Sequence, residues 1–205
     1  MSVHAVIPLK DPVNGKTRLS SALATPLRMQ LIRAMLEHVA SCLATSRHIA
    51  EVNVLTSRPY LVPRGCAYLC DEGLDLNSAV THAARELRAR GATGTLLVLH
   101  GDLPFVTPQE IGDLIAASGE DVIVAAPDSA DVGTNALTFS LSREVTPRFG
   151  ACSLAAHSEA ARAAGMAFKV LRRPGLANDI DEPSQLATLA ETGGERYAFL
   201  KSAVR

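Results

Sequence analysis

The sequence predicts an α/β fold in which a mixed, mostly parallel sheet is covered by helices on both faces. Short apolar runs alternate along the chain with longer segments whose apolar residues recur at helical spacing, and this alternation is typical of such sheets. No internal repeat, low-complexity tract or Pro/Gly-rich linker divides the 205 residues. We therefore expect a single domain spanning residues 1–205, with a C-terminal tail at 192–205 that frays or packs on a partner subunit.

Seven apolar runs predict the strands, and the strongly apolar run at 95–99 ends abruptly in a polar loop. The complete set is residues 3–7, 51–56, 67–70, 95–99, 122–126, 136–139 and 167–171. Ligands of open parallel sheets bind beyond the carboxyl ends of the strands. We therefore look for chemistry after the strands that end at positions 7, 99, 126 and 171.

Five segments between the strands predict helices. The first carries apolar residues at helical spacing over nearly 20 positions. Thr107 is a natural N-cap for the third, with Pro108 at its first position, and Asp75 or Asn77 is available near the start of the second. The set is residues 26–44, 76–90, 108–117, 153–164 and 182–190.

The composition excludes several classes of protein. The chain has 20 Lys and Arg against 21 Asp and Glu, a formal net charge of −1, so it lacks the positive surface that binds duplex nucleic acid or anionic membranes. No stretch approaches the roughly 20 apolar residues of a membrane helix, and the N-terminus lacks a signal-peptide pattern. We expect a cytoplasmic protein with no nucleic-acid or membrane partner, whose four cysteines are reduced structural thiols.

The first loop, residues 8–21, carries a signal for phosphate binding. Lys10, Lys16 and Arg18 lie in it, directly after the first strand, and Lys16 follows Gly15. Backbone N–H groups beside a small residue approach phosphate oxygens closely, while Lys16 and Arg18 neutralise charge. The loop is not a Walker A motif, because the spaced glycine before Gly-Lys-Thr is missing. We favour a polyphosphate ligand; the alternative is a solvated basic loop without one.

Three carboxylates predict a divalent metal site. Asp102 lies just after the strongly apolar strand at 95–99, where an unpaired charge is costly, and its position suits a Mg²⁺ ligand. Asp179 and Asp181 lie two residues apart, so extended backbone turns both side chains to the same side, where they repel unless a cation separates them. The alternatives are that Asp102 caps the turn before Pro104 and that Asp181 caps the following helix.

Two further segments offer hydrogen-bond donors to a small phosphorylated acid. Thr134 lies in a Gly-Thr-Asn stretch before a strand, and Gly150 to Ser153 lead into a helix whose N-terminus favours anions. The alternatives are a tight turn at the first segment and a simple N-cap at Ser153.

Taken together, the chain resembles the guanylyltransferases that activate a small phosphorylated acid for the deazaflavin coenzyme F-420. The resemblance covers residues 7–183 in the family's order, and its motifs are IPLKDPVNGKTRL, DEGLDLNSAV, GDLPF, GTNAL, RFGACSLAAH and NDIDEP. It implies a nucleotidyltransferase architecture, Rossmann-like and similar to the nucleotide-binding half of GT-A glycosyltransferases. The acceptors described for the family are 2-phospho-L-lactate, phosphoenolpyruvate and 3-phospho-D-glycerate.

The resemblance also implies roles for individual residues, with GTP and Mg²⁺ as ligands. It places the metal on Asp102, Asp179 and Asp181, and the acid on Thr134, Gly150 and Ser153. It places the triphosphate on Lys16 and Arg18, and the rest of the nucleotide near Pro8, Leu9, Lys10 and Asn77, so that Lys16, Arg18 and Asp102 are the catalytic residues. A downstream transferase that accepts the labile product is the implied metabolic partner, and a homodimer is possible.

The chain departs from the family near the predicted acid site. His100 stands where many relatives have a small apolar residue, Cys152 precedes Ser153, and the loop before Gly133 lacks the usual Arg. Their roles, and the identity of the acid, stay open at the level of sequence.

Two rival functions remain because fold does not dictate function. The first is a sugar-phosphate nucleotidyltransferase or GT-A-like glycosyltransferase, although Asp102 stands without the D-x-D triplet of the glycosyltransferases. The second is a non-catalytic subunit that binds GTP and releases no pyrophosphate.

Overall fold

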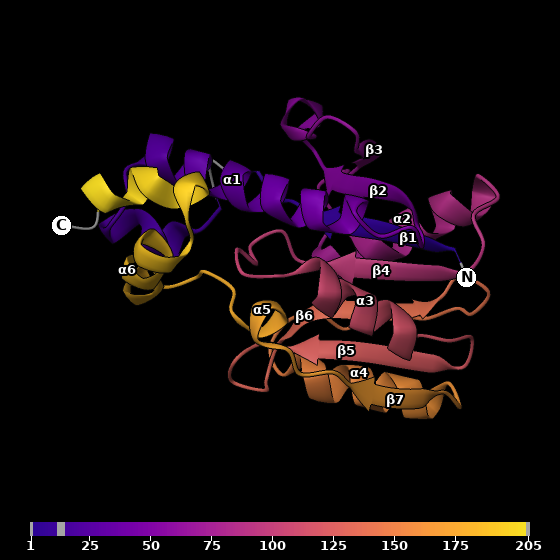
Figure 1. Ribbon diagram of the computed structural model, residues 1–205. Coiled ribbons are helices and arrows are strands. Elements are labelled where there is room, and N and C mark those ends of the chain that lie inside the picture. Colours follow the sequence, from indigo (N-terminus) through magenta and orange to yellow (C-terminus); the bar gives the residue numbers. More distant parts are fainter. Residues whose placement is uncertain (1, 12–14, 204–205) are drawn as a thin grey trace.

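Seven strands form one sheet in the computed structural model, which describes residues 2–11 and 15–203 (Figure 1). The strand order is β3-β2-β1-β4-β6-β5-β7. β6 runs antiparallel to β4 and β5, and the other neighbouring pairs are parallel. The predicted α/β class with a mixed, mostly parallel sheet is therefore confirmed. The strands are β1 (Val3–Pro8), β2 (Ile49–Thr56), β3 (Ala67–Cys70), β4 (Thr95–Leu99), β5 (Val122–Pro127), β6 (Thr134–Ser140) and β7 (Ala167–Val170).

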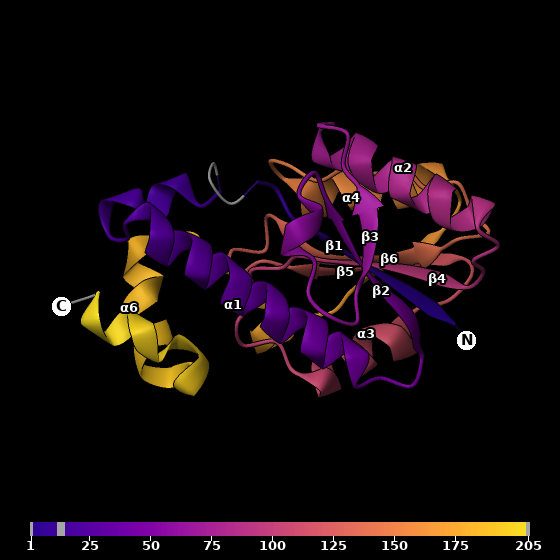
Figure 2. The ribbon, with the colours of Figure 1, turned by 90° about the horizontal axis from the view of Figure 1, so that it is seen from above.

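The helices cover both faces of the sheet, as Figure 2 shows. α1 and α3 pack on one face and α2 and α4 on the other, each against its own cluster of buried apolar side chains. The helices are α1 (Thr25–Ala44), α2 (Leu76–Ala89), α3 (Pro108–Ala117), α4 (Ser153–Ala163), α5 (Pro174–Ala177) and α6 (Pro183–Thr192), with 3-10 helices η1 (Thr17–Ser21), η2 (Pro59–Leu61) and η3 (Glu195–Ser202).

The boundaries of the expected elements agree with the structure to within two residues. The expected start of α3 is confirmed, because the Thr107 hydroxyl accepts the Glu110 N–H and the Glu110 carboxylate accepts the Thr107 N–H. Asp75, rather than Asn77, caps α2: its carboxylate accepts the N–H groups of Asn77 and Ser78. Two short helices were not expected from the sequence: η1 within the first loop and α5 before Asp179 and Asp181.

The C-terminal segment differs from expectation. Within the predicted tail, η3 packs back on α6 and α1, and Tyr197 and Leu200 are buried. They belong to a third apolar cluster, beyond the carboxyl ends of the strands, together with Leu19 of η1 and Met35 of α1. Figure 1 shows α6 and the first turns of α1 side by side at that end of the sheet. The segment therefore helps to bury this third apolar cluster. The single-domain organisation itself stays a prediction.

No helix in the described part of the chain combines the length and the apolar character needed to cross a membrane.

Candidate active site

A cavity of about 510 Å³ opens at the carboxyl ends of β1 and β4, where an open parallel sheet is expected to bind its ligands. All the predicted site residues except Arg18 and Asn77 line it. Those that line it are Pro8, Leu9, Lys10, Lys16, Asp102, Thr134, Gly150, Ser153, Asp179 and Asp181.

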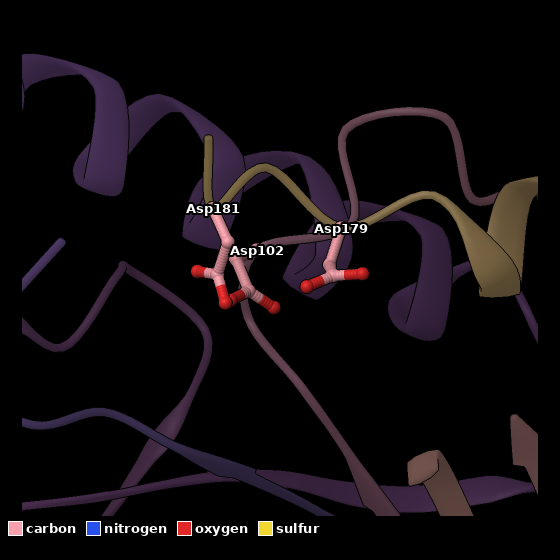
Figure 3. A group of neighbouring side chains, drawn as sticks. All are labelled: Asp102, Asp179 and Asp181. Atoms are coloured by element: carbon pink, nitrogen blue, oxygen red, sulfur yellow. The ribbon is translucent and has the colours of Figure 1, made fainter. Parts of the chain in front are cut away.

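The three predicted metal ligands form one cluster just beyond the carboxyl end of β4. One carboxylate oxygen from each of Asp102, Asp179 and Asp181 lies within 4.8 Å of the others, and Figure 3 shows the three carboxyl groups turned toward a common space. The Ile180 N–H donates to the Asp102 carbonyl at 3.2 Å and ties the two loops together. The alternative that Asp181 caps α6 is wrong, because Glu182 is the N-cap residue.

Lys16 reaches into this cluster from the first loop. Its Nζ donates to Asp102 Oδ2 and to Asp181 Oδ1, each at 2.5 Å, and its side chain is only 10% exposed. The backbone of Lys16 is left-handed, with φ 53°, an uncommon conformation for a residue with a side chain. Burial alone lowers the pKa of Lys16, but the two carboxylates outweigh it and the pKa is raised. Lys16 is therefore a permanent cation at neutral pH.

The charges of the cluster suit a divalent cation. Three carboxylates and one ammonium leave an excess of two negative charges, and burial together with Asp102 and Asp181 raises the pKa of Asp179. Burial also opposes ionisation of Asp102, but Lys16 and His100 lower the pKa of that carboxyl. Asp102 Oδ1 is buried without a hydrogen-bond partner among the described residues. A buried carboxylate oxygen without a donor is the kind of ligand that Mg²⁺ takes.

Two residues that were not predicted from the sequence hold the loop that carries Asp179 and Asp181. Gln185 Oε1 accepts the N–H of Asp181 and its Nε2 donates to the Asp179 carbonyl, at 2.7 and 2.9 Å. Asn135 Nδ2 donates to the Leu176 carbonyl at 3.0 Å and lies 3.4 Å from Asp179 Oδ1. A signal existed for Gln185, because Gln three residues after an N-cap is typical of a capping box.

The predicted acid-binding residues Thr134, Gly150 and Ser153 line the same cavity. Thr134 and Ser153 are buried, 3% and 2% exposed, and the Ser153 hydroxyl donates to Thr134 Oγ1 at 3.1 Å. The simple N-cap at Ser153 is wrong, because Cys152, in a left-handed conformation, precedes the helix and Ser153 is its first residue. Gly150 has φ 129°, which only glycine adopts without strain.

Two predicted nucleotide-binding residues lie outside the cavity lining. Arg18 is 70% exposed at its side chain and pairs with Glu182 at 3.1 Å. Asn77 Nδ2 donates to the Phe149 carbonyl at 3.0 Å, and its Oδ1 accepts the Phe149 N–H at 2.6 Å. The Asn77 amide therefore holds the main chain beside Gly150, which is one of the predicted acid-binding residues.

Two of the three departures from the family, His100 and Cys152, differ in position. His100 lines the cavity, its ring lies against Phe149 with centroids 5.5 Å apart, and its Nε2 is buried without a partner in the described residues. Cys152 is exposed and does not line the cavity.

The comparison with known proteins now decides the family. Residues 3–203 match the family model described as guanylyl transferase CofC like. The chain belongs to this family. It is 37% identical over 194 residues to a phosphoenolpyruvate guanylyltransferase of Sphaerobacter thermophilus, covering 93% of each chain, and 35% identical over 202 residues to one of Rubrobacter xylanophilus, covering 96% and 98%.

Solved structures show the same fold at low sequence identity. A crystal structure from Desulfovibrio desulfuricans, described as a candidate nucleotide-diphospho-sugar transferase, superposes with a TM-score of 0.80 at 19% identity and covers 98% of this chain and 95% of its own. A CMP:2-keto-3-deoxy-manno-octonic acid synthetase superposes with a TM-score of 0.59 at 13% identity, with 98% and 100% covered. The nucleotidyltransferase architecture is confirmed, and the protein is an enzyme of the guanylyltransferase class.

Proposed function

We propose that this guanylyltransferase joins GTP to phosphoenolpyruvate and releases pyrophosphate, as a step in coenzyme F-420 biosynthesis. One observation carries the proposal: a single cavity is lined both by a carboxylate cluster with Lys16 and by the hydroxyl residues Thr134 and Ser153. The carboxylate cluster with Lys16 suits a metal-bound triphosphate, and the two hydroxyls suit a small anionic acid. The names of the relatives favour phosphoenolpyruvate over 3-phospho-D-glycerate and 2-phospho-L-lactate.

The reaction needs little from the protein beyond alignment and charge. A phosphate oxygen of the acid attacks the α-phosphorus of GTP, a new P–O bond forms, and the bond to the β-phosphate breaks so that pyrophosphate leaves with the electron pair. A phosphate monoester has a second pKa of about 6, so it is largely dianionic near neutrality and needs no strong general base. Lys16, held at full charge, and Arg18 at the rim supply the positive charge for the triphosphate.

Asp102, Asp179 and Asp181 are the residues that would hold Mg²⁺. The cluster fits the ion because it has an excess of two negative charges and a buried carboxylate oxygen without a donor. Bound there, the ion supplies charge neutralisation for the phosphates. Pro8, Leu9 and Lys10 line the same cavity beside β1, which supports a place for the nucleotide there.

The product of this reaction is a phosphoanhydride, which hydrolysis destroys easily. We infer a downstream transferase that consumes it, and a cytoplasmic location where GTP and the acid are both available. A homodimer stays a prediction.

The test is pyrophosphate release with Mg²⁺ and GTP, measured separately with each of the three acids and repeated with ATP and CTP. We expect turnover with GTP and phosphoenolpyruvate. Turnover with another of the acids would revise the acceptor alone. A protein that binds GTP but releases no pyrophosphate with any of them would favour a sugar phosphate as acceptor or a non-catalytic subunit.

A variant checks the assignment of the metal. Asp102→Asn removes one anionic ligand with almost no change in shape, so we expect turnover to be lost while the circular dichroism spectrum stays that of the wild type. Near-wild-type turnover in Asp102→Asn would remove this carboxylate from the metal site.

A further inference from the structure

A chain of hydrogen bonds leads from the backbone of Arg148 through the buried His157 to Thr134, one of the predicted acid-binding residues. The Arg148 N–H donates to His157 Nε2 at 2.9 Å, and His157 Nδ1 lies 3.2 Å from Thr134 Oγ1. The hydroxyl of Ser153 donates to the same Thr134 oxygen at 3.1 Å. His157, on α4, is only 1% exposed and its ring meets Phe149 edge to face, with centroids 5.0 Å apart.

The hydrogen bond from Arg148 fixes the tautomer of His157. A backbone N–H can only donate, so Nε2 must be the unprotonated nitrogen of the ring. The proton of the neutral ring then lies on Nδ1, and the contact between Nδ1 and Thr134 has the imidazole as donor. Burial lowers the pKa of His157 to about 4, although a hydrogen bond with the Ser153 backbone opposes this shift. The ring is therefore neutral near pH 7 and keeps this tautomer.

The direction of these bonds determines what Thr134 offers to a ligand. A hydroxyl oxygen has two lone pairs and one hydrogen. His157 and Ser153 donate to both lone pairs of Thr134 Oγ1, and its own hydrogen has no acceptor among the described residues. Thr134 lines the cavity. Its hydroxyl therefore presents a hydrogen to an anionic oxygen placed there, whereas the hydrogen of Ser153 is already used.

We propose that His157 is a positioning residue that holds the Thr134 hydroxyl as a donor to the phosphorylated acid. The inference rests on the proposed function, because it concerns the acid in the same cavity. It separates the roles of two residues that the family pattern places together: Thr134 donates to the acid, and Ser153 helps to hold Thr134.

The tautomer can be measured directly in the wild-type enzyme. We would record two-bond ¹H–¹⁵N correlation spectra of the ¹⁵N-histidine-labelled protein at pH 7, with His157→Gln to identify the resonance by its loss. We expect His157 to be protonated at Nδ1 and unprotonated at Nε2. Protonation at Nε2, or at both nitrogens, would overturn the proposal without any need for activity.

Steady-state kinetics tests the consequence for the acid. Removal of a hydrogen bond to a charged group raises a dissociation constant by roughly 10- to 100-fold. We therefore expect His157→Leu and Thr134→Val to raise the KM for phosphoenolpyruvate by about 10-fold or more, with the KM for GTP within about 2-fold. His157→Gln, which offers an acceptor and a donor, and Thr134→Ser, which keeps the hydroxyl, should restore most of the loss. Ser153→Ala should have a smaller effect than Thr134→Val.

His82→Gln, an exposed histidine of α2, is the matched control and should leave both KM values unchanged. Circular dichroism and thermal melting show whether each variant folds. This inference alone would be overturned if the wild type uses phosphoenolpyruvate and a folded Thr134→Val variant keeps the wild-type KM for phosphoenolpyruvate. A wild type that turns over none of the acids would overturn the proposed function and the inference with it.

Discussion

Replacement of Lys16 by methionine tests whether the ammonium and a divalent cation serve the same carboxylates. The methionine keeps an unbranched stem of similar length but removes the charge that lies 2.5 Å from both Asp102 and Asp181. The excess negative charge of the cluster then rises from two to three. The repulsion among the carboxylates destabilises the folded state, and a bound divalent cation relieves it.

The expected loss of stability depends on how exposed the two ion-pair partners of Lys16, Asp102 and Asp181, are. Removing one member of a buried ion pair costs about 3–5 kcal/mol, whereas an exposed pair is worth about 0–1 kcal/mol. The side chains of Asp102 and Asp181 are 25% and 49% exposed, so the pairs lie between these limits. We expect the free energy of unfolding to fall by about 2 kcal/mol, which in a chain of this size lowers Tm by about 4–8 °C.

The assay is thermal unfolding of wild type and Lys16→Met, with a chelator and with saturating Mg²⁺. Ligand binding to the folded state adds about 2.7 kcal/mol at a hundred times Kd, and the variant should bind more tightly because it lacks the competing ammonium. The Tm difference should therefore shrink by at least about half in Mg²⁺. Arg33→Met is the control, because Arg33 pairs with Glu37 on an exposed face of α1. A Tm difference that is equal in both buffers would refute the reasoning.

Three more predictions follow from particular contacts. Gly175→Ala should lower the free energy of unfolding by about 1–3 kcal/mol, and with it the urea midpoint, because a Cβ there would clash with Glu110 Oε2 and the Phe105 carbonyl oxygen. An unchanged urea midpoint would contradict this close approach. Gln185→Ala should raise the Mg²⁺ concentration for half-maximal activity by about 10- to 100-fold, and a lower kcat with an unchanged Mg²⁺ requirement would speak against it. The pKa of His157 is about 4 in the folded state, against its ordinary value of 6.5. Between pH 4 and pH 6.5, the unfolded chain therefore carries a proton on His157 that the folded chain lacks. The free energy of unfolding should then fall by up to about 3 kcal/mol as the pH falls from about 6.5 to 4, and His157→Gln should remove that part of the titration.

The metal cluster could be predicted because its signal is local. Asp102 follows a strongly apolar strand, and the spacing of Asp179 and Asp181 turns both side chains to one side. The carboxyl ends of parallel strands meet at one edge of a sheet, so these segments were expected to come together. The structure brings their oxygens within 4.8 Å.

Most of the contacts that hold the site residues could not be predicted, because their signal is not local. Asn135 and His157 are ordinary polar residues in their own segments, and only the packed loops show what they hold. The contacts of the C-terminal segment could not be predicted for the same reason. Nothing in the sequence of η3 says that Tyr197 meets α1, more than a hundred residues earlier in the chain.

The sequence by itself determined the α/β class, the boundaries of the expected elements to within two residues and half of the cavity lining. Apolar periodicity, caps and strand-end loops act over a few neighbouring residues, and so they can be recognised without knowledge of the rest of the chain. The tertiary structure alone decided the antiparallel direction of β6, the ion pairs of Lys16 with Asp102 and Asp181, and the hydrogen that Thr134 presents to the cavity. Lys16 and Asp181 are 165 residues apart in the chain, and a contact over that separation depends on how the whole sheet and its helices pack.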